Sequence, residues 1–337
     1  MQELSAFTKT SKHVMLASNN GKVYKPCKNY SIHDVCNWMV EIDDPNDLCV
    51  SCRLTETIPN LDEENNRRLW FLLEQSKRRL LYSVIKLKLP VSNRTEDPIN
   101  GLGFDFLQNQ TEDEFGNELF IKNFVTTGHS NGLITINIDE ADPAKRIKLR
   151  EKMKEGYRTL LGHFRHESGH YYWDRLVRDS YRLNEFRELF GDERLNYQDA
   201  MSNYYANGPA ANWQKVWISA YATMHPWEDF AETWAHYLHM VDTLETANNI
   251  DLSISQVEII SPYTATKTHS KLDTEISFSK LYNDWCALTG VINSLNRSMG
   301  MDDAYPFVIS ITALNKLRFV HQVIMELTEL DENIPSE

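Results

Sequence analysis

Apolar residues recur at three- and four-residue steps along three long stretches of the chain, a spacing that gathers them on one face of a helix. The first stretch, residues 62–89, carries leucines on its apolar face and stops at Pro90, which cannot continue a helix. The second runs from residue 143 to about residue 180, and the third from residue 306 to about residue 330. Asp142, followed by a proline, is a typical start for the second helix. The chain is therefore predicted to be mostly helical.

One short stretch has the pattern of a strand. Residues 133–138 alternate between apolar and polar positions, as a half-buried strand does. The segment 128–132 before them begins and ends with glycine and is a predicted turn. Residues 251–277 are polar and β-branched and predict a loop. Together these patterns indicate an α+β fold in which helices predominate.

The composition is that of a globular protein, with 42% hydrophobic and 11% aromatic residues in a chain of 337. No run of about 18 apolar residues occurs, and residues 1–12 lack the apolar centre of a signal peptide. We therefore expect a cytoplasmic protein that does not enter membranes. The net charge of −13 argues against nucleic-acid binding. The densest basic run, residues 77–79, is expected to be a solvated helix face.

The second predicted helix contains the motif His166-Glu167-Ser168-Gly169-His170, which is H-E-x-x-H. Histidines four positions apart lie on one face of a helix, where both can bind one Zn²⁺, and Glu167 can then take a proton from the zinc-bound water. The apolar face of the helix continues onto the histidine side, so the motif is expected to point inward, where buried polar groups need partners. The alternative is a solvated or core helix face that matches the motif by chance. His163, on the same face, is interpreted as a satisfied histidine, either in the core or bonded to a metal ligand from outside.

Four of the five cysteines, Cys27, Cys36, Cys49 and Cys52, fall within 26 positions. In a reducing compartment such a cluster favours a structural zinc site over disulfides, and Cys49-x-x-Cys52 is a typical zinc knuckle. Buried free thiols or a redox pair are the alternatives. Cys286 stands alone and is predicted to be a small buried hydrophobe.

Long runs of the sequence resemble one known family. The runs that carry the resemblance are residues 27–30, 36–38, 49–61, 101–107, 157–176, 190–194 and 225–239. They resemble bacterial zinc-binding metallopeptidases that carry an N-terminal zinc-ribbon region. The resemblance implies a zinc-ribbon-like module over residues 1–60 and a zincin-like metallopeptidase domain over residues 61–337, which begins with a connecting helix at 61–90. The family's ribbon usually opens with further C-x-x-C knuckles, whereas no cysteine precedes Cys27 here, so one cysteine-bound metal is expected.

A catalytic zinc usually has three protein ligands, so a third ligand is expected besides the two histidines. The segment 225–239 is its expected source. Glu228 and Glu232 are one helical turn apart there, and Ala231 and Ala235 on the same side would let two helices approach closely. This arrangement resembles that of gluzincins, in which the first acid binds the metal and the second hydrogen-bonds a ligating histidine. The resemblance implies that Glu228 is the third ligand and that Glu232 hydrogen-bonds a ligating histidine.

Other residues of the same segment provide alternatives. His225, His236 and His239 are rival ligands, and Asp229 is expected to belong to a solvated helix face. An electrophilic group is also expected beside the developing oxyanion of the reaction. Tyr221 lies seven residues before Glu228, where gluzincins similar to lethal factor also carry a tyrosine. The resemblance implies Tyr221 for this role, with His225 as its alternative.

These features predict zinc-dependent hydrolysis of peptide bonds, with Glu167 as general base and with one catalytic and one structural zinc. In zincin-like proteases a strand near the metal-binding helix forms the edge of a small sheet, where a peptide substrate pairs as an added strand. The N-terminal module is a candidate docking site for a protein partner, and its acidic residues disfavour nucleic acid there. The alternative function is that of a zinc-stabilised binding or adaptor protein, or of a pseudo-protease, whose metal site lacks an open position.

Overall fold

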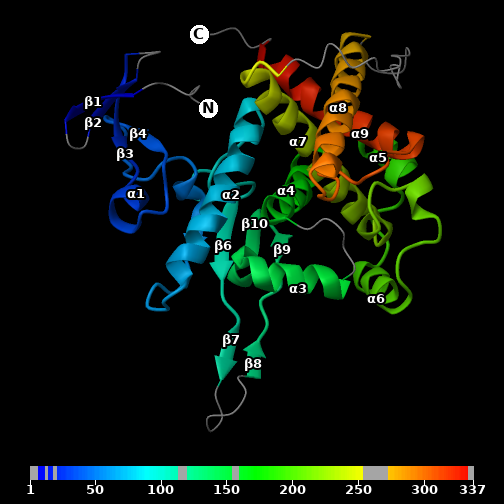
Figure 1. The fold of residues 1–337 in the computed structure, drawn as a ribbon, viewed down its shortest axis with the longest axis horizontal. Helices are drawn as coiled ribbons and strands as arrows, with labels where there is room; N and C mark the ends of the chain where they lie inside the picture. The colour runs from blue at the N-terminus through cyan, green and yellow to red at the C-terminus, as the bar shows by residue number, and fades with distance from the viewer. Residues whose placement is uncertain are drawn as a thin grey trace. The chain divides into compact units, whose positions relative to one another are not determined.

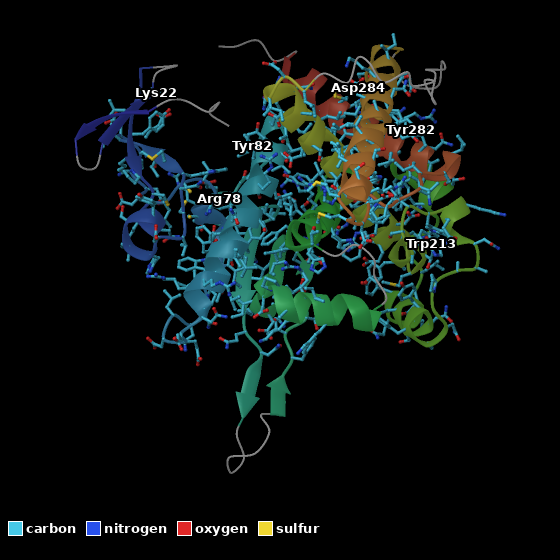
Figure 2. The ribbon with its side chains drawn as sticks, in the orientation of Figure 1. Lys22, Arg78, Tyr82, Trp213, Tyr282 and Asp284 are labelled. Atoms are coloured by element: carbon cyan, nitrogen blue, oxygen red, sulfur yellow. The ribbon has the colours of Figure 1, made fainter. Side chains whose placement is uncertain are left out.

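The computed structural model describes residues 7–11, 14–17, 21–112, 120–153, 159–252 and 272–332 (Figure 1). The chain divides into two compact units, the first comprising Met1–Lys86 and Pro90–Glu167 and the second Leu87–Leu89 and Ser168–Glu337. The division falls inside α4 (Leu160–Leu176), which is one continuous helix. Figure 2 shows the side chains of both units, with Arg78 on a helix of the first and Tyr282 on a helix of the second.

The first unit begins with a small antiparallel sheet around the cysteines. Its strands follow the order β1-β2-β3-β4 along the chain and in space: β1 (Phe7–Ser11), β2 (Val14–Ala17), β3 (Val23–Pro26) and β4 (Met39–Glu41). The short helix α1 (Lys28–His33) connects β3 to β4, and the 3₁₀ turn η1 (Cys52–Leu54) follows. The cysteine segments thus lie at the ends of short, regular elements.

A second sheet of the first unit has the strand order β5-β6-β10-β9. Its strands are β5 (Thr55–Thr57), β6 (Gly103–Leu107), β10 (Leu133–Asn137) and β9 (Gly128–Ser130). β10 pairs parallel with β6 and antiparallel with β9, and β5 pairs parallel with β6. A hairpin of β7 (Gln110–Glu112) and β8 (Phe120–Asn123) extends beyond this sheet (Figure 1). The predicted boundary at residue 60 stays a prediction, and β5, before it, already belongs to this sheet.

The strand predicted at residues 133–138 is confirmed as β10, with Ile134 and Ile136 fully buried. It is not an edge strand, however, because β6 and β9 flank it on both sides. The expected turn at 128–132 is only partly right: its first three residues form β9, and the chain turns at Asn131 and Gly132, both at positive φ. Sequence alternation does not reveal this short edge strand.

The first long helix is confirmed as α2 (Asn66–Lys86), shorter at both ends than the pattern suggested. Leu69, Leu73, Leu80 and Leu81 are buried as predicted. Lys88, at a φ of 54°, has left the helical conformation just before Pro90. The helix therefore ends before the proline rather than at it.

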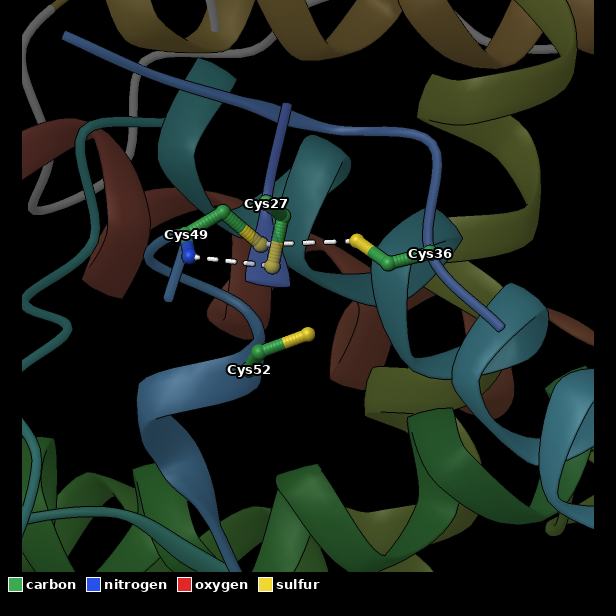
Figure 3. A group of neighbouring side chains, drawn as sticks. All are labelled: Cys27, Cys36, Cys49 and Cys52. Carbon is green, nitrogen blue, oxygen red and sulfur yellow. Dashed lines mark hydrogen bonds between the residues drawn. The ribbon is translucent and has the colours of Figure 1, made fainter. Parts of the chain in front are cut away.

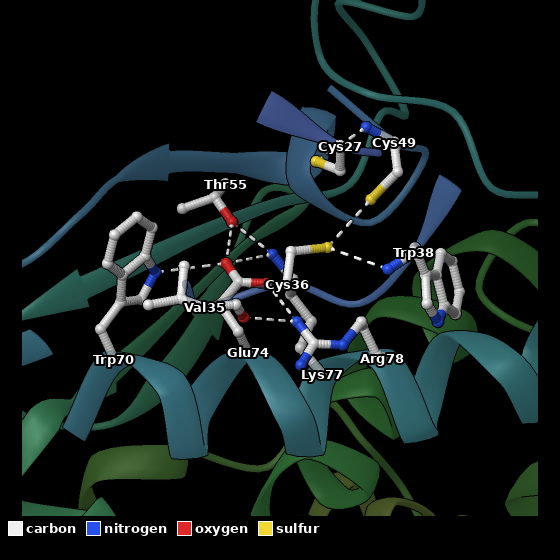
Figure 4. Close-up of polar contacts among 10 residues, drawn as sticks. All are labelled: Cys27, Val35, Cys36, Trp38, Cys49, Thr55, Trp70, Glu74, Lys77 and Arg78. Carbon is white, nitrogen blue, oxygen red and sulfur yellow. Dashed lines mark hydrogen bonds and ion pairs between the residues drawn. The ribbon is translucent and has the colours of Figure 1, made fainter. Parts of the chain in front are cut away.

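The expectation that residues 77–79 form a solvated basic face is wrong, because the Lys77 side chain is completely buried and Arg78 nearly so. Lys77 Nζ donates a hydrogen bond of 2.8 Å to Glu74 Oε1 and another to Thr55 Oγ1 (Figure 4). Trp70 Nε1 and Thr55 Oγ1 donate to the same carboxylate oxygen at 3.3 and 2.8 Å. The basic charge is thus balanced inside the unit, as a buried ion requires.

This buried cluster joins helix α2 to the cysteine-bearing segments. Arg78 Nη1 donates a 2.9 Å hydrogen bond to the carbonyl of Val35, next to Cys36. Thr55 begins β5 directly after η1, which starts at Cys52. The two sides of the cysteine cluster are therefore both attached to one face of α2 (Figure 4).

The second predicted helix is in fact two helices, α3 (Pro143–Met153) and α4. Asp142 caps α3 as predicted, since its Oδ1 accepts the backbone N–H groups of Ala144 and Lys145 at 2.8 and 3.2 Å. Thr159 is not helical; its Oγ1 accepts the N–H of Gly162 at 2.9 Å and so caps α4. The intervening residues 154–158 lie outside the described part of the chain. The prediction of one continuous helix overlooked this threonine cap.

The second unit is helical. Besides the C-terminal part of α4 it contains α5 (Leu183–Phe190), α6 (Tyr197–Asn207), η3 (Trp213–Lys215), η4 (Tyr221–Thr223), α7 (Pro226–Asn249), α8 (Leu272–Ser298) and α9 (Ile311–Glu332). Helix α7 packs against α5, α8 and α9. Its Phe230 joins an aromatic core with Phe186, Phe190 and Phe319, whose ring centroids lie 4.9 to 6.5 Å apart.

The C-terminal predictions are partly confirmed. The third long helix is α9, and Leu314, Leu317, Val320 and Ile324 are buried as expected, whereas Ile311 at its first position is 71% exposed. Residues 272–277, expected in a loop, begin α8, and residues 253–271 lie outside the described part. Within the described ranges, the structure contains no helix with the length and apolar character needed to cross a bilayer.

The buried ion pair between Glu74 and Lys77 on α2 predicts a large effect of removing one partner on stability. We expect Lys77→Met to lower the free energy of unfolding by about 3–5 kcal/mol, because Glu74 would keep a buried charge without its partner. Combining it with Glu74→Leu should recover much of the loss, since no uncompensated charge then remains. Urea denaturation measures both effects, and Arg67→Met, at an exposed position of the same helix, is the control. A loss below about 1 kcal/mol for Lys77→Met, as for exposed pairs, would contradict the buried pairing.

Candidate metal centres

The two motif histidines lie one turn apart on α4 and meet Glu228 of α7. One ligand atom from each of His166, His170 and Glu228 lies within 4.8 Å of the other two. His170 and Glu228 are almost completely buried, and His166 is half-buried. The structure thus brings together the three donors assigned from the sequence.

The first half of α4 is anchored within the first unit. The Phe164 ring packs against Phe104 and Phe106 of β6, with centroids 5.9 and 6.2 Å apart. His163 Nδ1 contacts a carboxylate oxygen of Glu140, so His163 is a satisfied histidine, as interpreted from the sequence. These contacts hold the turn that precedes His166.

The residues between the two histidines explain how α4 and α7 approach. A Cβ atom at Gly169 would lie 2.8 Å from the Cα of Ala231, closer than packed atoms come, so glycine is needed here. Beside this contact, Trp234 Nε1 donates a 3.1 Å hydrogen bond to Ser168 Oγ. The expected close approach at Ala231 is confirmed, and it places Glu228, one turn earlier on α7, beside His170.

Glu228 is held from several directions. Its Oε1 lies 3.3 Å from His170 Nε2 and accepts a 2.7 Å hydrogen bond from the hydroxyl of Tyr197. The ring of Trp227 packs on the His170 imidazole with a centroid separation of 3.9 Å. Glu228 is also in the first turn of α7, where the helix dipole favours a carboxylate.

Two of the rival histidines have other roles. His225 caps α7: its Nδ1 accepts the N–H of Trp227 at 3.1 Å, and its Nε2 donates to the carbonyl of Leu195 at 3.1 Å. His236 Nδ1 forms a 2.6 Å hydrogen bond with the Tyr305 hydroxyl, and burial lowers the pKa of His236 to about 4. His239 packs beside His236, with ring centroids 6.1 Å apart. None of the three belongs to the metal-competent cluster found among the described residues.

The proposed supporting residues are placed as follows. Glu167 is nearly buried beside His166. Glu232 Oε2 accepts a 2.6 Å hydrogen bond from Ser219 Oγ, and its expected bond to a ligating histidine stays a prediction. Tyr221 lies in η4 with its ring edge-on to Tyr204, 5.6 Å between centroids, and its role as oxyanion donor also stays a prediction.

Tyr197 was missed by the sequence analysis. It precedes Glu228 by 31 positions and lies on a different helix, α6. No local spacing links the two residues, and the chain has 15 tyrosines, so no sequence signal singles this one out. Only the packing of α6 reveals the contact.

The expectation that Asp229 belongs to a solvated face is wrong. The side chain is fully buried, and Lys316 Nζ of α9 donates a 2.5 Å hydrogen bond to its Oδ2 and another of 3.2 Å to the carbonyl of Val216. Burial raises the pKa of Asp229 to about 7, although the Lys316 ammonium opposes this shift. The pair ties α9 to the turn of α7 that carries Glu228.

The four clustered cysteines form the second centre (Figure 3). All four are free and buried, and their sulfur atoms lie within 4.8 Å of one another. The Cys36 and Cys49 sulfurs are 3.6 Å apart, too far for a disulfide bond. Backbone N–H groups donate to two of them, Cys49 N to Cys27 Sγ at 3.3 Å and Trp38 N to Cys36 Sγ at 3.4 Å. Such bonds stabilise thiolates.

The electrostatics of this cluster fit a cation. Hydrogen bonds from the Cys36, Cys49 and Cys52 thiols lower the pKa of Cys27, whereas the pKa of Cys52 is raised, first by its hydrogen bond to Cys27. Four buried sulfurs at these separations repel once ionised, and a divalent cation among them removes that repulsion. Four thiolates in a closed tetrahedron are the donor set of structural zinc.

The donor set of the first centre is different. Two imidazoles and one carboxylate suit zinc and leave a tetrahedral ion one position for water. The described residues contain these two clusters of three or more metal-competent side chains. The donors of the His166, His170 and Glu228 cluster are typical of a catalytic zinc site, and the four cysteines are typical of a structural zinc site.

Comparison with known proteins finds two family models that match this chain and relatives that cover most of it. Residues 66–323 match the family model "Putative zinc-binding metallo-peptidase", and residues 1–63 match a zinc-ribbon domain model. Uncharacterized proteins of Mycobacterium bovis and Mycobacterium tuberculosis are 42% identical over 293 residues, which is 87% of this chain and 80% of each relative. No solved structure matches the chain. The chain therefore belongs to this family of zinc-binding metallopeptidases and carries a zinc-ribbon domain at its N-terminal end.

Proposed function

We propose that the protein hydrolyses peptide bonds at a zinc site formed by His166, His170 and Glu228. The observation that supports this most is the convergence of these three donors within 4.8 Å, with Glu167 next to the first histidine in the motif. Zinc held there would act as a Lewis acid and would lower the pKa of a water molecule to about 7. The substrate is a peptide or protein.

Glu167 is the general base in this proposal. Its carboxylate takes a proton from the attacking water as the water oxygen bonds to the carbonyl carbon of the peptide. The same carboxylic acid then gives the proton to the nitrogen as the C–N bond breaks, so that Glu167 returns to its starting form. Glu167 is nearly buried and directly follows the first motif histidine, and this position beside the proposed zinc ligands supports the role.

Glu232 and Tyr221 are assigned supporting roles. Glu232 orients a ligating imidazole, and Tyr221 donates a hydrogen bond to the developing oxyanion, with His225 as its alternative. Both ring nitrogens of His225 are used in capping α7 and binding Leu195, and this favours Tyr221 over His225. The cysteine cluster holds a second, structural zinc, because four thiolates leave no position for a substrate.

The alternative, a pseudo-protease or adaptor, requires a fourth protein ligand that closes the catalytic site. His225 and His236, two of the rival ligands, are engaged in hydrogen bonds to other groups, and this weighs against the alternative. A cytoplasmic location, the absence of nucleic-acid binding, and docking of a protein partner on the N-terminal module stay predictions.

The role of Glu167 can be tested by Glu167→Gln. We expect the variant to retain zinc and to lose about 10²–10⁴-fold in turnover, because the amide cannot accept the proton. Zinc content by elemental analysis and cleavage of a fluorogenic peptide library provide the two measurements. Glu188→Gln, at an exposed position of α5, is the matched control. Full activity of Glu167→Gln would refute the proposed base.

The two centres predict a metal stoichiometry. The wild-type chain should hold about two zinc ions, of which a chelator removes one readily, since an open site exchanges metal faster than a closed one. The double variant His170→Ala, Glu228→Ala should lose binding of the labile ion. The double variant Cys49→Ser, Cys52→Ser should lose binding of the resistant ion. Cys286→Ser should retain both. A single zinc in the wild type, or loss of both from either pair of substitutions, would be inconsistent with two independent sites.

A further inference from the structure

Tyr197 contacts Glu228, and the sequence did not predict this contact. The phenol hydroxyl donates to Glu228 Oε1 at 2.7 Å, and the same oxygen lies 3.3 Å from His170 Nε2. Glu228 is almost completely buried, so solvent does not compete strongly for this oxygen. One side of the ligand carboxylate is therefore oriented by a hydrogen bond from another helix.

The Tyr197 ring is itself held in place. It packs edge-on against His225 and Trp227, with centroids 5.4 and 6.0 Å apart. These residues flank the start of α7, and Trp227 also packs on His170. The hydroxyl is thus positioned by the same short segment that presents Glu228.

Helix α6 is the element that carries Tyr197. None of its residues from Tyr197 to Asn207 is buried. Its start is fixed by Asn196, whose side chain accepts the N–H of Asp199 at 3.0 Å. Tyr197, at the first helical position, is the residue through which α6 reaches the buried carboxylate of α7, and Tyr204, further along α6, packs against Tyr221.

The chemistry of this contact favours a positioning role. A glutamate loses side-chain entropy when one rotamer is selected, and a fixed hydrogen-bond donor selects that rotamer before any ligand arrives. A phenol is neutral near pH 7, so it orients the carboxylate without bringing a positive charge that would repel a metal ion.

We propose that Tyr197 is a positioning residue that holds Glu228 in its metal-binding orientation. The inference rests on the proposed metal site, because Glu228 must be a ligand for its orientation to matter. Tyr197 acts on the affinity for the metal through Glu228 and does not act on the substrate.

The test is zinc affinity in the absence of substrate. Protein depleted of its labile zinc and retaining the cysteine-bound ion is titrated with zinc against a chromophoric chelator. Tyr197→Phe should weaken binding by about 10–100-fold, as removal of an outer hydrogen bond to a metal ligand typically does. The absorption spectrum of Co²⁺ at this site should change as well, because the carboxylate is then less constrained. Tyr205→Phe, an exposed position on the same helix, should leave both unchanged.

A double-mutant cycle separates positioning from folding. In a Glu228→Gln background, Tyr197→Phe should change zinc affinity by less than about threefold, because the oriented group is already lost. If Tyr197→Phe destabilised the whole protein, the loss would persist in that background and the proposal would be wrong. An affinity within about twofold of wild type in the single variant would also overturn it.

Activity at saturating zinc adds an independent outcome. Turnover of Tyr197→Phe should then recover to within a few-fold of wild type, since only metal occupancy was impaired. A persistent loss of about 100-fold in kcat would assign Tyr197 to the substrate oxyanion and contradict the positioning role. A wild-type chain that binds zinc without cleaving peptides would refute the proposed hydrolysis and leave this inference standing.

Discussion

The close approach of α4 and α7 is the constraint on which the cluster of His166, His170 and Glu228 depends. With no side chain at Gly169, the backbone of α4 comes within contact distance of Ala231, where an added Cβ would lie 2.8 Å from the Ala231 Cα. The separation of the two helices sets the distance from His170 to Glu228, since a glutamate side chain reaches only a few ångströms. The two variable positions of the H-E-x-x-H motif are thus as important for building the site as its histidines.

Both centres are supported by charges buried next to them. Asp229 and Lys316 form an ion pair one residue beyond Glu228, and Glu74 and Lys77 form another beneath the cysteine segments. Such pairs contribute little net stability, because desolvation cancels most of the attraction, but breaking one is costly. Their value here lies in specificity. The Asp229–Lys316 pair fixes α9 against α7, whereas Glu74 and Lys77 lie on the same helix and hold α2 to β5 through their hydrogen bonds with Thr55. The single hydrogen bond from Tyr197 adds the same kind of constraint to one oxygen of Glu228.

The parts of the site that were predicted from sequence share one property, namely that their signal is local. His166 and His170 are one helical turn apart, Glu228 and Glu232 likewise, and the four cysteines fall close together in the chain. The family resemblance then linked these local signals. What was missed depends on pairing over long distances: Lys316 meets Asp229 across 87 positions, and Tyr197 meets Glu228 across 31. Asp229 was predicted to be solvated because its buried partner, Lys316, is far away in the sequence. The interruption before α4 was missed because apolar spacing continued through it, although Thr159 provided a capping side chain.

The most direct test of this account is a crystal structure of the zinc-loaded protein with data collected at the zinc absorption edge. The account predicts an ion bound by His166, His170 and Glu228, with a solvent molecule in the fourth position beside Glu167. An ion enclosed by a fourth protein side chain, or a Glu228 carboxylate directed away from the two imidazoles, would contradict it.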